Sequence, residues 1–384
     1  MGQDVSGQAR TPAETRAFSK ALLRDLRALE EMIAQGLFES GVRRIGAEQE
    51  MFLVNEAWRP ASTALEILER LDGPFTTELA LYNLEANVEP VDLAGPAFSS
   101  LEARLNELVA QARAAAREVG SEILLTGILP TLAKSDVTLD NITPRARYYA
   151  LNGAVSTMRR GQPLKLRIQG SDELYTEHDS VMLESCNTSF QVHLQLDPEN
   201  FAEAYNVAQV VTAPVLAAAV NSPLLFGKQL WDETRIALFQ QSIDTRSGSV
   251  YTRDLSPRVR FGERWATSSV ADLFQEDIAR FRVLLTRDLD EDPLQILEEG
   301  GIPKLQALAL HNGTVYRWNR ACYGVKDNVA HMRIEARAVG SGPTVLDEVA
   351  NAAFLWGALV ALSEEVGDIR SRLAFSDARR NFSA

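Results

Sequence analysis

Four stretches of this 384-residue chain alternate polar and apolar residues with a period of two, the pattern of a β-strand with one face on a core. Long segments with apolar residues at helical spacing separate these stretches along the chain. Strands this amphipathic, mixed with long helices, predict an α+β fold in which helices pack on the apolar face of an antiparallel or mixed sheet. The four predicted strands are residues 43–54, 83–90, 187–196 and 331–338.

The polar faces of these strands carry acids, one histidine and arginines. Glu48 and Glu50 share a face of the first strand, and Glu85 and Glu89 share a face of the second. Neighbours on one face of a strand lie about 6.5–7 Å apart, so like charges repel there unless cations lie between them. A polar face exposed to solvent would explain any one strand taken alone, but the set suits Mg²⁺ or Mn²⁺ bound with phosphates. Its remaining members are His193, Arg333, Glu335 and Arg337.

The first predicted helix covers residues 11–36. Thr11 is a capping residue, Pro12 takes the first helical position, and Glu14 completes a capping box. We expect residues 1–384 to form one domain, with this helix packed on it and an irregular, arginine-rich loop at 244–264. Further helices are predicted at 61–71, 97–119, 197–221, 233–242, 268–286 and 344–366, and weaker strands at 121–127, 164–169 and 314–318.

Charge, apolar runs and missing motifs exclude several classes of protein. The 52 acids against 39 bases give a net charge of −13, so the chain lacks the basic surface that nucleic-acid binding requires. Its most apolar run, residues 207–220, is too short at 14 residues to span a bilayer, and residues 1–10 lack the apolar core of a signal peptide. The sequence contains no CxxC, GxxxxGK[ST], GxGxxG, HExxH or GxSxG motif. We therefore expect a soluble, cytoplasmic protein without nucleic-acid or membrane partners.

Seven short motifs follow one another along residues 40–365. The first is Gly46–Phe52 (GAEQEMF), and Leu84–Asn87 (LEAN) follows it on the next predicted strand. Together the motifs resemble those of the type 2 glutamate–cysteine ligase family, which are carboxylate–amine ligases with a glutamine synthetase-like fold. The other five are Thr126–Pro130 (TGILP), Phe190–His193 (FQVH), a segment with Pro214, Ala219–Pro223 (AVNSP), Gly227 and Arg235, another with His311–Thr314 (HNGT) and Arg320, and Arg333–Arg337 (RIEAR).

This resemblance implies both a fold and a reaction. The sheet would be curved and mainly antiparallel, with a concave polar face that binds ATP and Mg²⁺, or Mn²⁺ in its place. ATP would phosphorylate a carboxylate, typically the γ-carboxylate of glutamate, and an amine such as cysteine would displace phosphate from the acyl phosphate to form an amide. The expected partners are therefore ATP and a small amino-acid substrate, and a homo-oligomer is compatible with the sequence.

The resemblance also assigns roles to residues, position by position. The implied catalytic residues are Glu335 and Arg337. An arginine suits phosphates and carboxylates alike because its planar fork pairs with two oxygens at once. The implied metal ligands are Glu48, Glu50, Glu85, His193 and Glu335, with Glu78 as an addition, and the implied contacts to nucleotide phosphates or substrate carboxylates are Arg235, Arg320 and Arg337.

Two segments depart from the family pattern and leave the substrates open. Residues 83–90 carry asparagines and an extra glutamate, and residues 171–186 match no family motif. The amine and the carboxylate donor need not be cysteine and glutamate. A small-molecule kinase and a non-catalytic nucleotide- or metal-binding protein remain alternatives on the same fold.

The arginine-rich loop at 244–264 allows two interpretations. It could close over the phosphates as a lid that keeps water from an acyl phosphate, or it could be an ordinary surface loop. The arginines that a lid would use are Arg246, Arg253, Arg258 and Arg260.

Overall fold

The computed structural model describes residues 11–246 and 256–384, and at its centre lies a seven-stranded antiparallel sheet. The strand order is β12-β13-β7-β1-β3-β2, and β4 pairs with the C-terminal end of β1. β1 lies between β3 and β7, so its side chains are central to both faces. The strands are β1 (Arg44–Val54), β2 (Phe75–Thr77), β3 (Asn83–Asp92), β4 (Glu122–Leu124), β7 (Phe190–Leu196), β12 (Asn319–Lys326) and β13 (Val329–Ala336).

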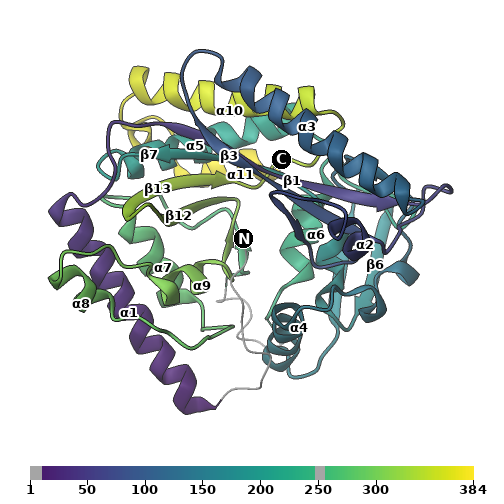
Figure 1. Cartoon of the computed structure of the whole chain (residues 1–384), viewed down its shortest axis with the longest axis horizontal. Helices are drawn as coiled ribbons and strands as arrows, with labels where there is room; N and C mark the ends of the chain where they lie inside the picture. Colours follow the sequence, from purple (N-terminus) through teal and green to yellow (C-terminus); the bar gives the residue numbers. More distant parts are fainter. Residues whose placement is uncertain (1–10, 247–255) are drawn as a thin grey trace.

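Three long helices cover one face of this sheet (Figure 1): α3 (Ala97–Glu118), α5 (Phe201–Ala218) and α10 (Val345–Glu365). Ile45 and Met51 of β1 are buried in the same core as Trp356 of α10. We call this the core face of the sheet, and the opposite face, which carries Glu48 and Glu50, the cavity face. The predicted α+β class, with a curved, mainly antiparallel sheet and helices on its apolar face, is confirmed.

Helix α10, and not the apolar segment 207–220, is the longest strongly apolar helix among the described residues. Within the described residues it is the one helix long and apolar enough to cross a membrane by length and composition. It packs along α5 and α3, and Leu355, Trp356 and Leu359 are buried there. Contacts of this kind are typical of a core helix.

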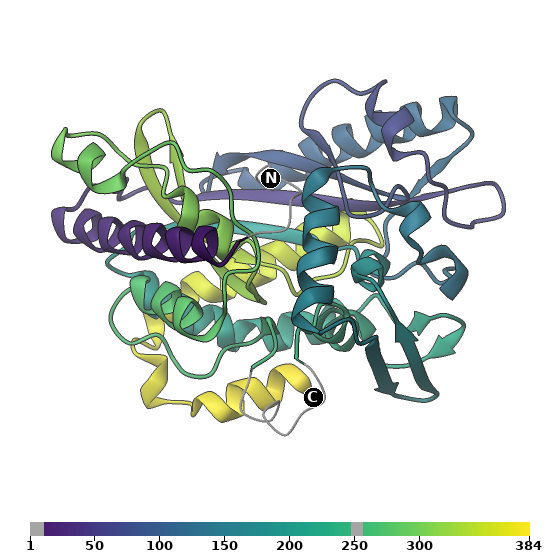
Figure 2. The same cartoon turned by 90° about the horizontal axis from the view of Figure 1, so that it is seen from below.

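Two groups of elements flank the cavity face (Figures 1 and 2). The group on the left of Figure 1 contains α1, which has the predicted capping box and packs against α7, α8 and α9. The group on the right contains α4, α6 and the hairpin of β5 and β6. Their bounds are α1 (Pro12–Gln35), α7 (Ala271–Arg280), α8 (Pro293–Glu298), α9 (Gln306–Asn312), α4 (Ala146–Met158), α6 (Thr234–Ser242), β5 (Leu164–Gln169) and β6 (Glu173–His178).

Most predicted elements are present but shorter than expected. The helix predicted at 61–71 is α2 (Ala64–Leu68), and the strand predicted at 314–318 is only β11 (Tyr316–Arg317), which pairs with β10 (Val259–Arg260) outside the main sheet. The remaining elements are the pair β8 (Leu224–Leu225) and β9 (Lys228–Gln229), α11 (Phe375–Ser383) and the 3₁₀ turns η1 (Lys134–Asp136), η2 (Leu139–Asn141), η3 (Val181–Cys186) and η5 (Ile369–Ser371).

Three elements that line the cavity, α4, β12 and η3, were not predicted, and neither was β6. α4 mixes polar and apolar residues on every side, so it gives no helical period. In β12 the alternation breaks at Gly324, and only pairing with β13 defines the strand. The unmatched segment 171–186 forms β6 and η3.

One expected member of the polar face is displaced. The register of β3 against β1 shifts between Ile45 and Ala47, where the segment from Val88 to Val91 holds the extra residue. Glu89 lies in this irregular stretch, is exposed and pairs with Lys326. Glu85 and Asn87, before the shift, keep their register with Glu50 and Glu48.

Candidate active site

The strand pairing brings the predicted polar residues together on the cavity face. Glu50 lies opposite Glu85 in the β1–β3 pair, and His193 lies opposite Glu335 in the β7–β13 pair. Directly opposed residues in antiparallel strands have Cβ atoms about 4.5–5.5 Å apart. Residues that are far apart in the sequence therefore form one continuous patch of side chains.

Glu48, His193 and Glu335 form the first of two groups on this patch, which we call the histidine cluster. One ligand atom from each residue lies within 4.8 Å of the other two. His193 Nε2 lies 3.5 Å from Glu48 Oε1 and 3.9 Å from Glu335 Oε2, and this buried nitrogen has no hydrogen-bond partner among the described residues. Burial lowers the pKa of His193, against the opposing pull of Glu48 and Glu335, which favours the neutral imidazole that binds metals.

Glu50, Glu78 and Glu85 form the second group, which we call the acid cluster. Again one carboxylate oxygen from each lies within 4.8 Å of the others. Burial, followed by the charges of Glu85 and Glu50, raises the pKa of Glu78 well above its usual range. Burial and the charge of Glu48 raise the pKa of Glu85 to about 7. Glu85 is buried and Glu50 and Glu78 are half-buried, and three carboxyl groups this close repel one another unless they take up protons or a cation.

Neighbouring groups hold two members of the acid cluster in position. Glu50 accepts hydrogen bonds of 2.6 Å from the Ser189 amide and from Gln191 Nε2. Glu85 accepts a 2.7 Å hydrogen bond from Asn87 Nδ2. Gln191 lies two residues before His193 on β7, and Asn87 lies two residues after Glu85 on β3, so both amides share the polar face with the acids and fix the directions of the carboxylates.

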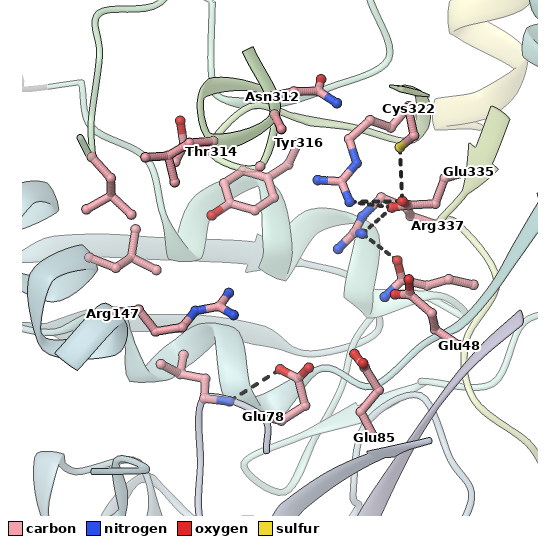
Figure 3. Close-up of a pocket in the computed structure, with 18 of the residues that line it drawn as sticks. Glu48, Glu78, Glu85, Arg147, Asn312, Thr314, Tyr316, Cys322, Glu335 and Arg337 are labelled. Carbon is pink, nitrogen blue, oxygen red and sulfur yellow. Dashed lines mark hydrogen bonds and ion pairs between the residues drawn. The ribbon is translucent and has the colours of Figure 1, made fainter. Parts of the chain in front are cut away.

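Arg320 and Arg337 both pair with Glu335, and Figure 3 shows Arg337 beside it. Arg320 Nη2 lies 2.8 and 2.9 Å from the two carboxylate oxygens of Glu335, and Arg337 Nη1 contacts both Glu335 and Gln191. Burial alone would raise the pKa of Glu335, but Arg320 and Arg337 outweigh it and hold this pKa well below its usual range. Glu335 is therefore ionised, and the two guanidinium groups line the cavity beside it.

The structure does not bring Arg235 to the cavity. Its side chain is buried, with Nη1 3.1 Å from Glu233 Oε1 and 2.9 Å from the carbonyl oxygen of Ala338. It packs so closely on Gly127 that a Cβ atom added there would lie 2.8 Å from Arg235 Cδ. Arg235 thus supports the backbone that follows β13 on the side away from the cavity. The order of the motifs along the sequence does not show whether an arginine lies in the cavity or behind it.

The arginine-rich segment is placed only in part. Residues 247–255, with Arg253, lie outside the described residues. Arg246 pairs with Asp244. Arg258 and Arg260 are buried, and Arg258 Nη1 donates to the carbonyl oxygen of Thr314. This placement argues against a lid role for Arg258 and Arg260, which support the wall of the cavity from inside the fold.

The cavity over the two clusters has a volume of about 340 Å³. Several charged or polar side chains that line it were not singled out from the sequence. They come from α4, η3 and β12, elements whose positions depend on tertiary packing, and from the short β11. These residues are Arg147, Tyr148, Glu184, Tyr316 and Cys322.

Comparison with known sequences identifies the family. The sequence model of glutamate–cysteine ligase family 2 matches residues 44–374, which include every strand of the central sheet. The chain belongs to this family. Membership of glutamate–cysteine ligase family 2 supports an amide-forming ligase that uses ATP. Among curated proteins, no sequence matches the chain.

Two solved structures are similar to the chain at low sequence identity. Glutamate–cysteine ligase from Francisella tularensis, in complex with AMP, is 13% identical with a TM-score of 0.48, over 90% of this chain and 71% of that chain. A bifunctional glutathione synthetase from Pasteurella multocida is 11% identical with a TM-score of 0.43, over 86% of this chain and 39% of that chain.

Proposed function

We propose that this member of glutamate–cysteine ligase family 2 is an ATP-dependent carboxylate–amine ligase that forms a γ-glutamyl-type amide through an acyl phosphate. The observation that carries the proposal is the adjacency of the histidine cluster and the acid cluster, with Arg320 and Arg337 beside them, in one cavity. Phosphorylation of a carboxylate brings an anion against a triphosphate, so neutralisation of negative charge is the main catalytic requirement.

The residues present fit divalent metal ions. Carboxylate oxygens with one imidazole nitrogen are a donor set that suits Mg²⁺ or Mn²⁺. The unpartnered His193 Nε2 and the mutually repelling carboxyl groups of the acid cluster are the features that a bound cation would satisfy. The histidine cluster and the acid cluster would each hold a metal ion. When bound, the ions would offset the negative charge of the phosphates.

The arginines supply the remaining positive charge. Glu335 holds Arg320 and Arg337 in fixed orientations through its two carboxylate oxygens. Because the guanidinium groups are already oriented, they need little rearrangement when the phosphoryl group is transferred. We therefore infer that Arg320 and Arg337 contact the phosphates or the reacting carboxylate, and that Glu335 both orients them and completes the histidine cluster.

Release of ADP and phosphate from Mg²⁺-ATP, with glutamate and a panel of amines that includes cysteine, tests the proposal. We expect turnover that requires an amine, with one phosphate released per amide formed. Glu85→Gln should lower this turnover by about 10²–10³-fold, and Glu89→Gln, on the same strand but exposed and outside the cavity, should not lower it. ADP release without any amine requirement would indicate a small-molecule kinase, and nucleotide binding without turnover would indicate a non-catalytic protein.

The cellular setting stays a prediction. A cytoplasmic location, the absence of membrane and nucleic-acid partners and the possibility of a homo-oligomer all come from the sequence. The small-molecule partners proposed are ATP and an amino acid.

A further inference from the structure

One wall of the cavity carries an arginine that is available to a ligand. Arg147 lies in the first turn of α4 and points into the cavity (Figure 3). Its Cζ lies 5.0 Å from the ring centroid of Tyr148, and it forms no hydrogen bond or ion pair with any residue that the structure describes. Arg320 and Arg337, by contrast, are already held by Glu335. An oriented, unpaired guanidinium group in a cavity is suited to an anionic group of a ligand.

The same wall carries an acid without a partner. Glu184 lies on η3, lines the cavity, and its carboxylate accepts no hydrogen bond within residues 11–246 and 256–384. Burial raises the pKa of Glu184 to about 7, with a further contribution from Glu50, while Arg337 and Arg147 lower it. Glu184 is half-buried, and its unpartnered carboxylate is available to a cation or a hydrogen-bond donor of a ligand in the cavity.

We propose that Arg147 and Glu184 form a subsite for the zwitterionic head group of an α-amino acid, in which Arg147 binds the α-carboxylate and Glu184 binds the α-ammonium group. Both side chains line the cavity and form no ion pair with each other, so each can pair with the opposite charge of a zwitterion. Leu151 follows Arg147 by one helical turn and also lines the cavity, where it offers an apolar surface to methylene groups. The inference rests on the proposed ligase function and assigns this wall to the amino acid whose side-chain carboxylate is activated.

The position of the wall separates this subsite from the clusters. Glu184 and Arg147 come from segments outside the central sheet, and neither belongs to the histidine cluster or the acid cluster. An amino acid held here by its head group would direct its other end toward the sheet, where the clusters and Arg337 lie. The subsite would thus select for a dicarboxylic amino acid over an amine or a simple dicarboxylate.

Steady-state kinetics with substrate analogues test each half of the subsite. Glutarate lacks the α-ammonium group of glutamate, and 4-aminobutyrate lacks its α-carboxylate. Loss of one charged hydrogen-bond partner weakens binding by about 10- to 100-fold. We expect Arg147→Leu to raise the KM for glutamate by that factor with the KM for ATP unchanged, and to make glutamate no better a ligand than 4-aminobutyrate in competition. Glu184→Gln should likewise make glutamate no better than glutarate.

Matched controls separate binding from folding. Arg145→Leu changes an exposed arginine just before α4, and Glu177→Gln changes an exposed acid of β6; both should behave as wild type. Melting temperatures of all variants show whether the fold is kept. Arg147→Lys keeps the charge but not the planar fork, so its KM for glutamate should lie between those of the wild type and Arg147→Leu.

Wild-type turnover of glutamate with an unchanged KM in both cavity variants would overturn the subsite and leave the ligase proposal intact. A rise in the KM for ATP alone would assign Arg147 to phosphate and also overturn it. Failure of the wild type to use glutamate with any amine would overturn the ligase proposal and the subsite together.

Discussion

The two faces of β1 bury carboxyl groups in opposite ways. On the core face, Glu348 of α10 is fully buried, and its Oε1 accepts hydrogen bonds from Gln49 Nε2 at 2.9 Å and from the Gly342 amide at 2.6 Å. On the cavity face, the acid cluster turns its carboxyl groups toward one another. Glu348 is held by donors at Oε1 and is part of the fold, although its Oε2 has no partner among the described residues. Acids that face one another in a cavity are stabilised only when they take up protons or a cation.

The cavity face itself contains both arrangements. Glu335 is an acid of the histidine cluster, yet Arg320 and Arg337 neutralise it within the protein. Glu85 has one hydrogen bond from Asn87 and no cationic side chain paired with it in the described chain. The two acids are therefore expected to serve the same reaction while contributing in opposite directions to stability.

Removal of the Glu335 charge should have the largest effect. Glu335→Gln leaves the half-buried guanidinium groups of Arg320 and Arg337 without the charge of their shared partner, which should cost about 2–3 kcal/mol of stability. Turnover should fall by about 10²–10³-fold as well, because the guanidinium groups lose their orientation. Denaturant unfolding and ADP release measure the two effects. An unchanged free energy of unfolding would show that the ion pairs of Glu335 with Arg320 and Arg337 contribute nothing to the stability of the fold.

Glu85→Gln should separate activity from stability. Turnover should fall by about 10²–10³-fold, since one ligand of the acid cluster is lost. In metal-free protein the melting temperature should stay the same or rise, because a like charge is removed from a repelling group. Calorimetry of both proteins in EDTA provides the comparison, with Glu89→Gln as the exposed control. A clear loss of stability would mean that Glu85 supports the fold as Glu348 does.

Glu348→Gln should change how stability depends on pH. Burial raises the pKa of Glu348 from an ordinary 4.5 to about 7. Between these values the folded chain holds a proton that the unfolded chain releases, so the free energy of unfolding falls as pH rises through this range. The variant lacks this loss and should be more stable than wild type at pH 8 by on the order of 2 kcal/mol, with little difference at pH 4.5. Parallel pH dependence in the two proteins would contradict this origin.

Addition of Mg²⁺ should give the smallest effect. A ligand at ten times its Kd stabilises the folded state by about 1.4 kcal/mol, which corresponds to a shift of a few degrees in melting temperature for a chain of this length. We expect this shift in the wild type and in Glu348→Gln, and a smaller one in Glu85→Gln. Titration of Mg²⁺ in a thermal-shift assay measures it. Equal shifts in all three proteins would place Mg²⁺ binding away from the acid cluster.

The sequence predicts the cavity face well because alternation is a local property of each strand. Glu48, Glu50, Glu85 and Glu335 line one cavity, and His193 lies beside Glu48 and Glu335, since the pairing of β3, β1, β7 and β13 keeps their side chains on one face. The family motifs show which residue of each strand belongs to the site and in which order these residues follow one another along the chain. Neither source distinguishes Glu335 from Glu85 in its effect on stability, because that difference depends on Arg320 from β12, a strand defined only by its pairing.

The residues that sequence reasoning missed or misplaced lie off the central sheet or behind it. Arg147 and Glu184 come from α4 and η3, whose positions depend on tertiary contacts such as the 3.1 Å hydrogen bond from the Val181 amide to Asn152 Oδ1. Arg235 carries a family motif but braces the backbone from behind the cavity. A family motif marks a residue as a candidate for the site and leaves open whether its side chain contacts the ligand or supports a residue that does.

Cavity and core residues alternate along β1, and this alternation determines which kinds of mutation the strand can tolerate. Glu48 and Glu50 enter the cavity, whereas Ala47, Gln49 and Met51 face the helices. Deleting or inserting one codon within this stretch would exchange the two sets, sending carboxylates into the core and aliphatic side chains into the cavity. In β1, substitutions at single positions should therefore be tolerated far more often than changes of length, and a library of one-residue indels across residues 47–52 should yield almost no folded protein.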